Sequence, residues 1–184
     1  MNDNESKLKK DFSEAEREFF KKNYKKSTKL YEIIVNQYPK LTPALHNLGL
    51  GYELLELFDK SIFYYKECCK ITPNEKTFIN KLGNIHFKIR EYQKACDEYD
   101  KSLNLDFKQV EIIEKFALSL MSLNLRDKAN NLLRKGLNFF PDDELLNTIF
   151  GRNLLSLNQH QEGLSFLKKG TGFIEIENDL IKII

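Results

Sequence analysis

The two glycines at Gly49 and Gly51 are the part of this sequence that most resembles a site for chemistry. Glycines at this spacing let a backbone approach phosphate groups closely. A dinucleotide fingerprint also needs a preceding strand and a third glycine, and Leu54 stands where that glycine would be. The sequence also lacks a phosphate loop ending in Gly-Lys-Ser or Gly-Lys-Thr. The glycine pair alone does not predict a phosphate site, so Gly49 needs another explanation.

Histidine and cysteine side chains are the other candidates for chemistry. They are His46, His86, His160, Cys68, Cys69 and Cys96. Their spacing fits no zinc-ligand motif, and no Cys-His or Ser-His-Asp arrangement can be argued from it. We therefore expect no catalytic residue, no metal ligand, no cofactor and no enzyme activity. His86 and Cys68 lie at apolar positions of expected helices, which predicts buried structural roles for both side chains.

Composition and charge indicate a helical globular protein. The 184 residues include 29 basic and 27 acidic side chains, which gives no general argument for a nucleic-acid or membrane partner. No apolar run approaches the roughly 20 residues of a membrane span, and the polar start lacks the apolar core of a secretory signal. The odd number of cysteines favours a reducing compartment. We expect a cytoplasmic protein that binds a protein or peptide, with no nucleic-acid or membrane partner.

A period of 34 residues runs through the chain. A large residue followed by a small one recurs at this spacing, and so does proline. Another small residue recurs as well, with a large residue four positions later. The recurring pairs are Leu48-Gly49, Leu82-Gly83, Phe116-Ala117 and Phe150-Gly151, and the recurring prolines are Pro39, Pro73 and Pro141. The second small column reads Ser27, Ser61, Ala95, Ala129 and Gly163.

Within each period, the spacing predicts two amphipathic helices. Leu45, Leu48, Gly49 and Tyr52 fall at i, i+3, i+4 and i+7, which is one helix face. A small residue facing a large one lets two helices approach closely, so Gly49 is expected to be a packing residue. Thr42, Asp59 and Asp127 precede or open the expected helices and are predicted to be N-caps.

The repeated unit resembles the tetratricopeptide repeat, a 34-residue helix–turn–helix with Leu-Gly, Tyr, Ala and Pro at fixed positions. The stretch LHNLGLGYELLELFDKSIFYYKECCKITP carries most of that pattern. The resemblance implies an all-α, right-handed α-solenoid over residues 1–172. It implies repeat units of about 8–41, 42–75, 76–109, 110–143 and 144–172.

Both ends of the chain depart from the pattern. At the start, Phe12, Phe19 and Phe20 are expected to form the apolar face, while Glu14 and Glu18 occupy core columns. Sliding this first helix by one residue would repair most of the conflict. At the end, residues 173–184 alternate apolar and polar side chains. They predict either a short β-hairpin that turns at Asn178-Asp179, with Glu175 opposite Lys182, or the start of a linker; a helix is the rival interpretation.

The resemblance also implies a function, which is binding of a protein or peptide in a concave groove lined by the first helix of each repeat. Amides and lysines in that groove could pair with carboxylates of an acidic partner. The candidates are Asn47, Asn80, Lys81, Asn84, Lys88, Lys115 and Arg152.

Other interpretations of the groove stay open. The polar residues could simply solvate it. The carboxylate clamp that some family members use for chaperone tails is not expected, because His46 and Leu50 replace its lysine and asparagine. Besides a scaffold or adaptor, the chain could be an N-terminal targeting or regulatory module of a larger enzyme, or a secretion-type chaperone.

Overall fold

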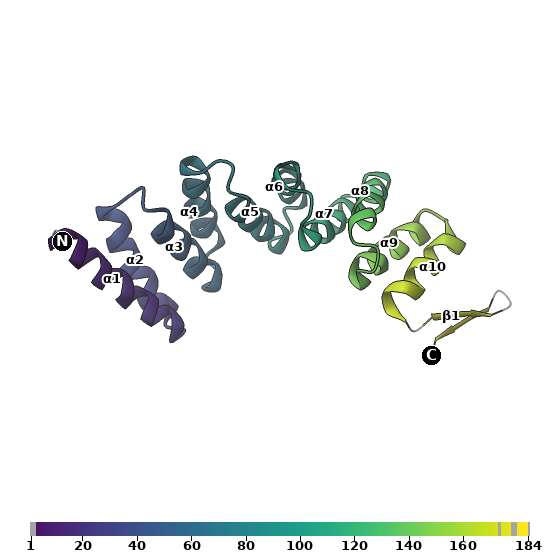
Figure 1. The fold of residues 1–184 in the computed structure, drawn as a ribbon, viewed down its shortest axis with the longest axis horizontal. Helices are drawn as coiled ribbons and strands as arrows, with labels where there is room; N and C mark the ends of the chain where they lie inside the picture. Colours follow the sequence, from purple (N-terminus) through teal and green to yellow (C-terminus); the bar gives the residue numbers. More distant parts are fainter. Residues whose placement is uncertain (1–2, 173, 178–179, 184) are drawn as a thin grey trace. The chain divides into compact units, whose positions relative to one another are not determined.

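The computed structural model describes residues 3–172, 174–177 and 180–183, and within them helices α1 to α10 precede strands β1 and β2 (Figure 1). The chain divides into two compact units, Met1–Ile85 and His86–Ile184. The helices are α1 (Asp3–Phe20), α2 (Tyr24–Gln37), α3 (Thr42–Leu54), α4 (Phe58–Ile71), α5 (Lys76–Lys88), α6 (Tyr92–Leu105), α7 (Val110–Ser122), α8 (Arg126–Phe139), α9 (Glu144–Ser156) and α10 (His160–Thr171).

Helix starts follow the period of 34 residues. The first helices of successive pairs begin at Thr42, Lys76, Val110 and Glu144. The second helices begin at Tyr24, Phe58, Tyr92, Arg126 and His160. The all-α solenoid fold of helix–turn–helix repeats is confirmed.

Three predicted N-caps are wrong. Helix α3 starts at Thr42 itself, with Leu41 before it and Pro43 in its first turn. Asp59 and Asp127 lie inside the first turns of α4 and α8 rather than before them. Their carboxylates still sit near the positive end of the helix dipole, which is a favourable place for an acid.

Gly49 packs helix α3 against helix α4, as the sequence predicts. A Cβ atom built on Gly49 would lie 3.2 Å from the ring of Tyr65, which is fully buried. The Ser61 hydroxyl of α4 donates a hydrogen bond of 2.7 Å to the Gly49 carbonyl. The two small residues thus bring the helices close enough for the Ser61 side chain to bond the Gly49 backbone directly, and the large Tyr65 ring packs against Gly49.

The first repeat keeps the same register, so the proposed one-residue slide of its first helix is wrong. Ala15 is fully buried, and its carbonyl accepts a 2.9 Å hydrogen bond from Ser27, as that of Gly49 does from Ser61. Glu18 is accommodated in its buried position because the Asn23 amide donates to it at 3.0 Å.

Phe20 was expected on the apolar face, but 81% of it is exposed. With Ala15 facing helix α2, the final residue of α1 points away from the packed face. The unshifted register therefore explains both the burial of Glu18 and the exposure of Phe20.

Gly51 stands outside the repeating columns, and the structure supplies its reason. A Cβ atom on Gly51 would lie 2.6 Å from the Cγ2 atom of Thr28 on α2. Gly51 therefore lets α3 approach the second helix of the preceding repeat. Gly49 therefore allows the contact of α3 with α4, and Gly51 allows the contact of α3 with α2.

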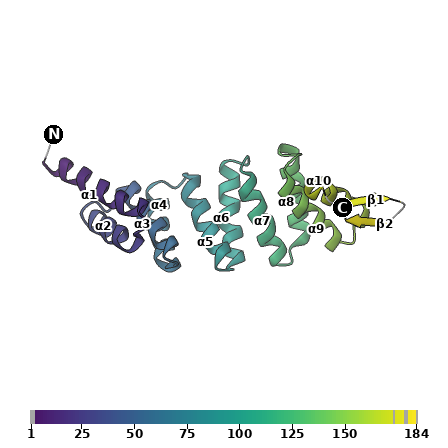
Figure 2. The same cartoon turned by 90° about the horizontal axis from the view of Figure 1, so that it is seen from below.

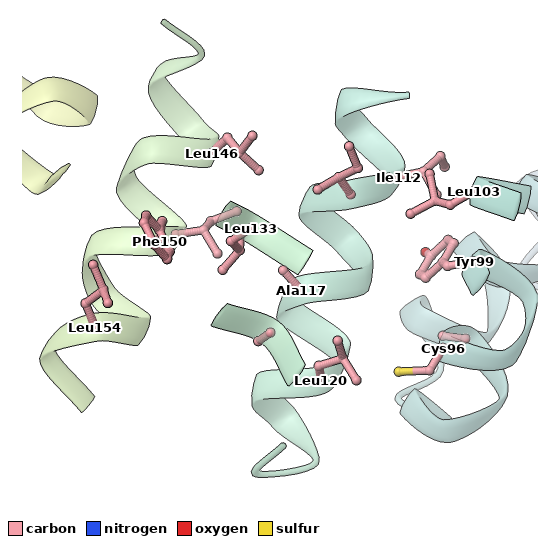
Figure 3. Close-up of a cluster of buried hydrophobic side chains, with 14 residues drawn as sticks. Cys96, Tyr99, Leu103, Ile112, Ala117, Leu120, Leu133, Leu146, Phe150 and Leu154 are labelled. Atoms are coloured by element: carbon pink, nitrogen blue, oxygen red, sulfur yellow. The ribbon is translucent and has the colours of Figure 1, made fainter. Parts of the chain in front are cut away.

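The core of the second unit joins helices α6, α7, α8 and α9 (Figure 3). Tyr99, Leu133 and Phe150 are fully buried there, and Ala117 occupies the small column shared with Gly49. The Phe150 ring meets the Phe166 ring of α10 edge to face, with centroids 4.6 Å apart. Cys96 lies in the same cluster, and burial raises the pKa of its thiol to about 11.

His86 and Cys68 are both buried, which confirms their predicted structural roles. His86 hydrogen-bonds Glu91 over 2.7 Å from its Nδ1 atom. Burial raises the pKa of the Cys68 thiol to about 12, so this thiol is protonated at neutral pH.

The turn within every repeat has one backbone geometry. Its central residue has a positive φ between 59° and 63°, and these residues recur every 34 positions. At Glu56, for example, the Leu57 amide donates to the Tyr52 carbonyl and the Glu56 amide donates to the Glu53 carbonyl. This pair of bonds is a Schellman motif, which satisfies carbonyl groups left open at a helix end. The five central residues are Lys22, Glu56, Arg90, Asn124 and Asn158.

Replacing Glu56 with asparagine is expected to stabilise the first unit. Glu56 is exposed at φ 59°, a conformation that asparagine adopts more readily than glutamate. We expect the free energy of unfolding to rise by about 0.5–1 kcal/mol in chemical denaturation. A Glu56→Ala variant is the control, because it removes the charge without relieving the backbone; an equal gain there would contradict the explanation.

Strands β1 (Ile174–Glu177) and β2 (Leu180–Ile183) pair antiparallel next to α10 (Figure 2). Glu175 is paired with Lys182, and Ile174 with Ile183. The turn expected at Asn178-Asp179 lies outside the described residues.

Candidate functional site

Helices α3 and α5 of the first unit present the candidate binding surface. Lys81 of α5 lies with its Nζ atom 3.6 Å from the Oε2 atom of Glu53 on α3. That carboxylate oxygen is buried and accepts no hydrogen bond from any described residue. We call His46, Asn47, Glu53 and Lys81 the α3–α5 surface. Its central ion pair is close enough to attract but too long to be a hydrogen bond.

A depression of about 370 Å³ opens beside His46, where α3 and α5 begin. The His46 ring lies 5.7 Å from the ring of Phe78 and 5.9 Å from that of Tyr65. Burial lowers the pKa of His46, so its imidazole is neutral at pH 7 and can both donate and accept. The depression is lined by Thr42, Pro43, His46, Thr72, Glu75, Thr77 and Phe78.

Asn47 was predicted to face a ligand, and the structure shows that it is already engaged. Its amide nitrogen donates a 2.9 Å hydrogen bond to the Tyr31 hydroxyl of α2, and its oxygen lies 3.3 Å from His46 Nδ1. The same column holds Lys81 after one period, and Lys81 approaches Glu53 instead of a tyrosine hydroxyl. Asn47 therefore links neighbouring repeats and orients His46.

The other predicted residues occupy varied environments. Asn80 and Asn84 are half-buried on α5. In the second unit, Lys115 pairs with Glu111 at 2.6 Å on the same helix, α7. Lys88 and Arg152 are exposed in that unit, on α5 and α9 respectively. Lys81 and Asn47 both act on His46, Asn47 through a hydrogen bond and Lys81 through its charge.

The sequence pattern does not single out Glu114, although its pKa is unusual. It lies on α7 and is only 9% exposed. Burial is the main cause that raises its pKa to about 7, and a hydrogen bond and charge from Asp143 add to it. Asp143 itself caps α9, because its carboxylate accepts a 2.8 Å hydrogen bond from the Leu146 amide. No signal in a single sequence distinguishes this glutamate from its polar column mates.

The described part of the chain has neither a metal-ligand cluster nor a helix suited to crossing a membrane. Its His, Cys, Asp and Glu side chains form no group of three or more that could hold a metal ion. Across residues 3–172, the helices lack the combination of length and apolar character that crossing a bilayer requires.

Paired helices that repeat every 34 residues, with small residues interlocked against aromatic ones, define a helical-repeat solenoid. The model of the tetratricopeptide repeat family matches residues 42–75 and 77–109. Residues 42–109 therefore carry two matched tetratricopeptide repeats, and the first of them contains the α3 half of the candidate surface.

Similar proteins include subunits of larger assemblies. Over 109 residues the chain is 29% identical to anaphase-promoting complex subunit 3 of Schizosaccharomyces pombe, which covers 59% of this chain and 16% of that protein. Over 128 residues it is 24% identical to the BBSome complex member BBS4 of Bos taurus, covering 69% and 24% respectively. The chain thus spans less than a quarter of the length of these relatives.

Solved structures show the same fold at low sequence identity. A crystal structure of MamA superposes with a TM-score of 0.80 at 20% identity, covering 86% of this chain and 92% of that one. YrrB, described as a TPR protein with an unusual peptide-binding site, superposes with a TM-score of 0.76 at 13% identity, covering 88% and 84%.

Proposed function

We propose that this chain is a non-catalytic scaffold or adaptor that binds a protein or peptide on the first helices of its repeats. The repeats themselves support this proposal, because their first helices carry polar side chains in series, such as Asn47, Lys81 and Lys115. Two similar proteins are named as members of complexes, and YrrB is described by a peptide-binding site. A cytoplasmic location is part of the proposal.

The observation that carries the proposal is the ion pair of the α3–α5 surface, in which one carboxylate oxygen accepts no hydrogen bond from the described residues. Glu53 Oε2 lacks a hydrogen bond from the described residues, and Lys81 Nζ stands 3.6 Å away. A carboxylate of the peptide could accept from Lys81, whose side chain is 30% exposed, while Glu53 holds the ammonium group in place. Beside the pair, His46 and Phe78 offer an apolar wall with a neutral imidazole for one side chain of the ligand.

Charge limits what kind of ligand fits. Lys81 and Lys115 each have a carboxylate neighbour, at 3.6 Å from Glu53 and 2.6 Å from Glu111. An acidic ligand must compete with these carboxylates, so we propose a ligand of mixed polarity with one acidic group near Lys81 rather than a strongly acidic one. The targeting-module and chaperone alternatives would use the same surface and differ only in the partner captured.

Replacing Lys81 with glutamine is expected to weaken partner capture. The change removes the cation that receives the ligand carboxylate and leaves Glu53 without its partner. The measurement is an affinity pull-down of the full chain with quantitative mass spectrometry, in which specifically captured proteins should fall about fivefold to tenfold.

Lys70→Gln is the matched control, since Lys70 also pairs with a glutamate but lies on the second helix α4. Both variants should keep the circular dichroism of the wild type. If Lys81→Gln captures the same proteins as Lys70→Gln in the same amounts, the α3–α5 surface is not the binding site.

A further inference from the structure

The first unit has a second distinctive surface, which is positively charged and is formed by lysines around the start of α2. Residues 21–29 read KKNYKKSTK, with five lysines and no acid, although the whole chain has nearly equal numbers of basic and acidic residues. Lys22, Lys25, Lys26 and Lys29 are exposed; Lys22 lies in the turn before α2, and the other three lie on α2 itself. The local charge is far from the average of the chain.

These lysines border a depression of about 450 Å³ between α2, the end of α3 and the start of α4. Lys25, Lys26 and Lys29 lie on the α2 side, and Lys60 lies on the α4 side. Its remaining lining residues are Thr28, Glu32, Tyr52, Leu55 and Leu57. A neighbouring depression of about 410 Å³ shares Lys25, Lys26 and Leu55 with it and adds Lys22. We call the two together the lysine depression.

Few carboxylates offset this charge. Lys26 lies 3.5 Å from Glu18, which Lys21 also approaches at 3.4 Å. Glu32 is engaged by the Tyr52 hydroxyl, which donates to it. Lys25 and Lys29 form no ion pair with any described residue of the chain.

The lysines also oppose the local rule for helix ends. The first turn of α2 contains Lys25 and Lys26 and no acidic residue, although the positive end of a helix dipole favours acids. Its N-cap Asn23 makes no side-chain cap bond and donates instead to Glu18 at 3.0 Å. Open amides and lysines here attract the same anionic group.

We propose that the lysine depression docks an acidic segment of a partner protein that also carries an apolar side chain. The lysine ammonium groups supply the positive rim, and Tyr52, Leu55 and Leu57 supply an apolar floor for that side chain. Charge at the rim steers the encounter, and the apolar floor holds the bound segment.

The geometry favours a protein segment over two other anionic partners. Stacking of nucleic-acid bases needs an open aromatic face. The Tyr52 ring is stacked on Tyr64 at 5.7 Å, and Lys60 lies 4.8 Å from the Tyr52 ring centroid. A flat membrane surface would not fill a hollow of this size, whereas a side chain of a peptide would. The lysine depression shares no lining residue with the α3–α5 surface, so the two proposals stand or fall separately.

The test measures binding of a short fluorescent peptide of Asp, Glu and Leu to the full chain by fluorescence polarisation. A peptide with Asn and Gln in place of its acids is compared with it. In the variant Lys25→Glu/Lys29→Glu, the affinity for the acidic peptide should fall at least about tenfold. The control Lys94→Glu/Lys101→Glu makes the same change of charge at exposed positions of α6 and should stay within about twofold of wild type.

Added salt should weaken the wild-type complex, because exposed charges are screened. If the charge-reversed variant loses its helical circular dichroism, Lys25→Gln/Lys29→Gln replaces it, with a loss of about threefold expected. Equal loss in the α6 control overturns the proposal, as does equal affinity for the neutral peptide. It is also overturned if phosphatidylserine vesicles or polythymidylate bind through Lys25 and Lys29 while the acidic peptide does not.

Discussion

A Gly151→Ala variant is expected to lose about 3 kcal/mol of unfolding free energy, the upper part of the range for overpacked cores. The added Cβ atom would lie 2.7 Å from the carbonyl oxygen of Gly163 and 2.8 Å from the backbone nitrogen of Leu167. Backbone atoms cannot rotate away as a side chain can. Helices α9 and α10 must therefore separate, which loosens the contact between Phe150 and Phe166.

Chemical denaturation gives the size of this loss, and hydrogen exchange gives its location. Exchange should accelerate in α9 and α10 before other helices of the second unit. The matched control is Gly49→Ala, where the nearest atoms belong to the Tyr65 ring at 3.2 Å. Because a ring can shift by a few tenths of an ångström, we expect a cost below about 1 kcal/mol there. Equal losses in the two variants would refute the role assigned to backbone contact.

The second large effect is a pH dependence set by Glu114. Its pKa is raised from an ordinary value of 4.5 to about 7 in the folded chain. The folded state therefore binds more protons than the unfolded state between these values. Stability contributed by this group is fully present below about pH 4.5 and is lost as pH rises through about 7. We expect the free energy of unfolding of the second unit to fall by on the order of 2 kcal/mol over that interval.

Denaturant unfolding at several pH values measures this fall. A Glu114→Gln variant keeps a neutral side chain at every pH, so its stability should change much less between pH 4.5 and about 7. Glu144→Gln, at an exposed glutamate on α9, is the control and should retain the wild-type dependence. A flat wild-type profile, or a fall that persists in Glu114→Gln, would show that Glu114 does not carry the effect.

Much of the fold is predictable from this sequence because packing repeats with the period. The Gly49 column and the burial of Tyr65 and Cys68 all follow from small and large residues at fixed spacing. The turns are harder to predict from the sequence. Lys22, Glu56 and Arg90 adopt the left-handed conformation without being glycine or asparagine, so nothing in their residue type announces it. Tertiary packing holds these turns against the local preference.

The candidate site is less predictable than the fold, since a column identifies a face but not the partners on it. Asn47 and Lys81 share a column, yet Asn47 bonds the Tyr31 hydroxyl while Lys81 approaches Glu53. The first helix shows the same limit. Its two glutamates suggested a slipped register, whereas Asn23 and Lys21 satisfy Glu18 without any slip. Whether a buried glutamate is tolerated depends on polar partners from a neighbouring element, which the repeat pattern does not reveal.

The Schellman turns repeat their backbone hydrogen bonds whatever residue stands at the centre, from Lys22 to Asn158. The joint between two helices is therefore independent of the side chains that distinguish one repeat from another. If a segment one period long is duplicated or deleted in frame, it recreates the same joint at the breakpoint, wherever the cut falls within the unit. Such a chain can change its number of repeats by recombination of its coding sequence without having to evolve a new turn.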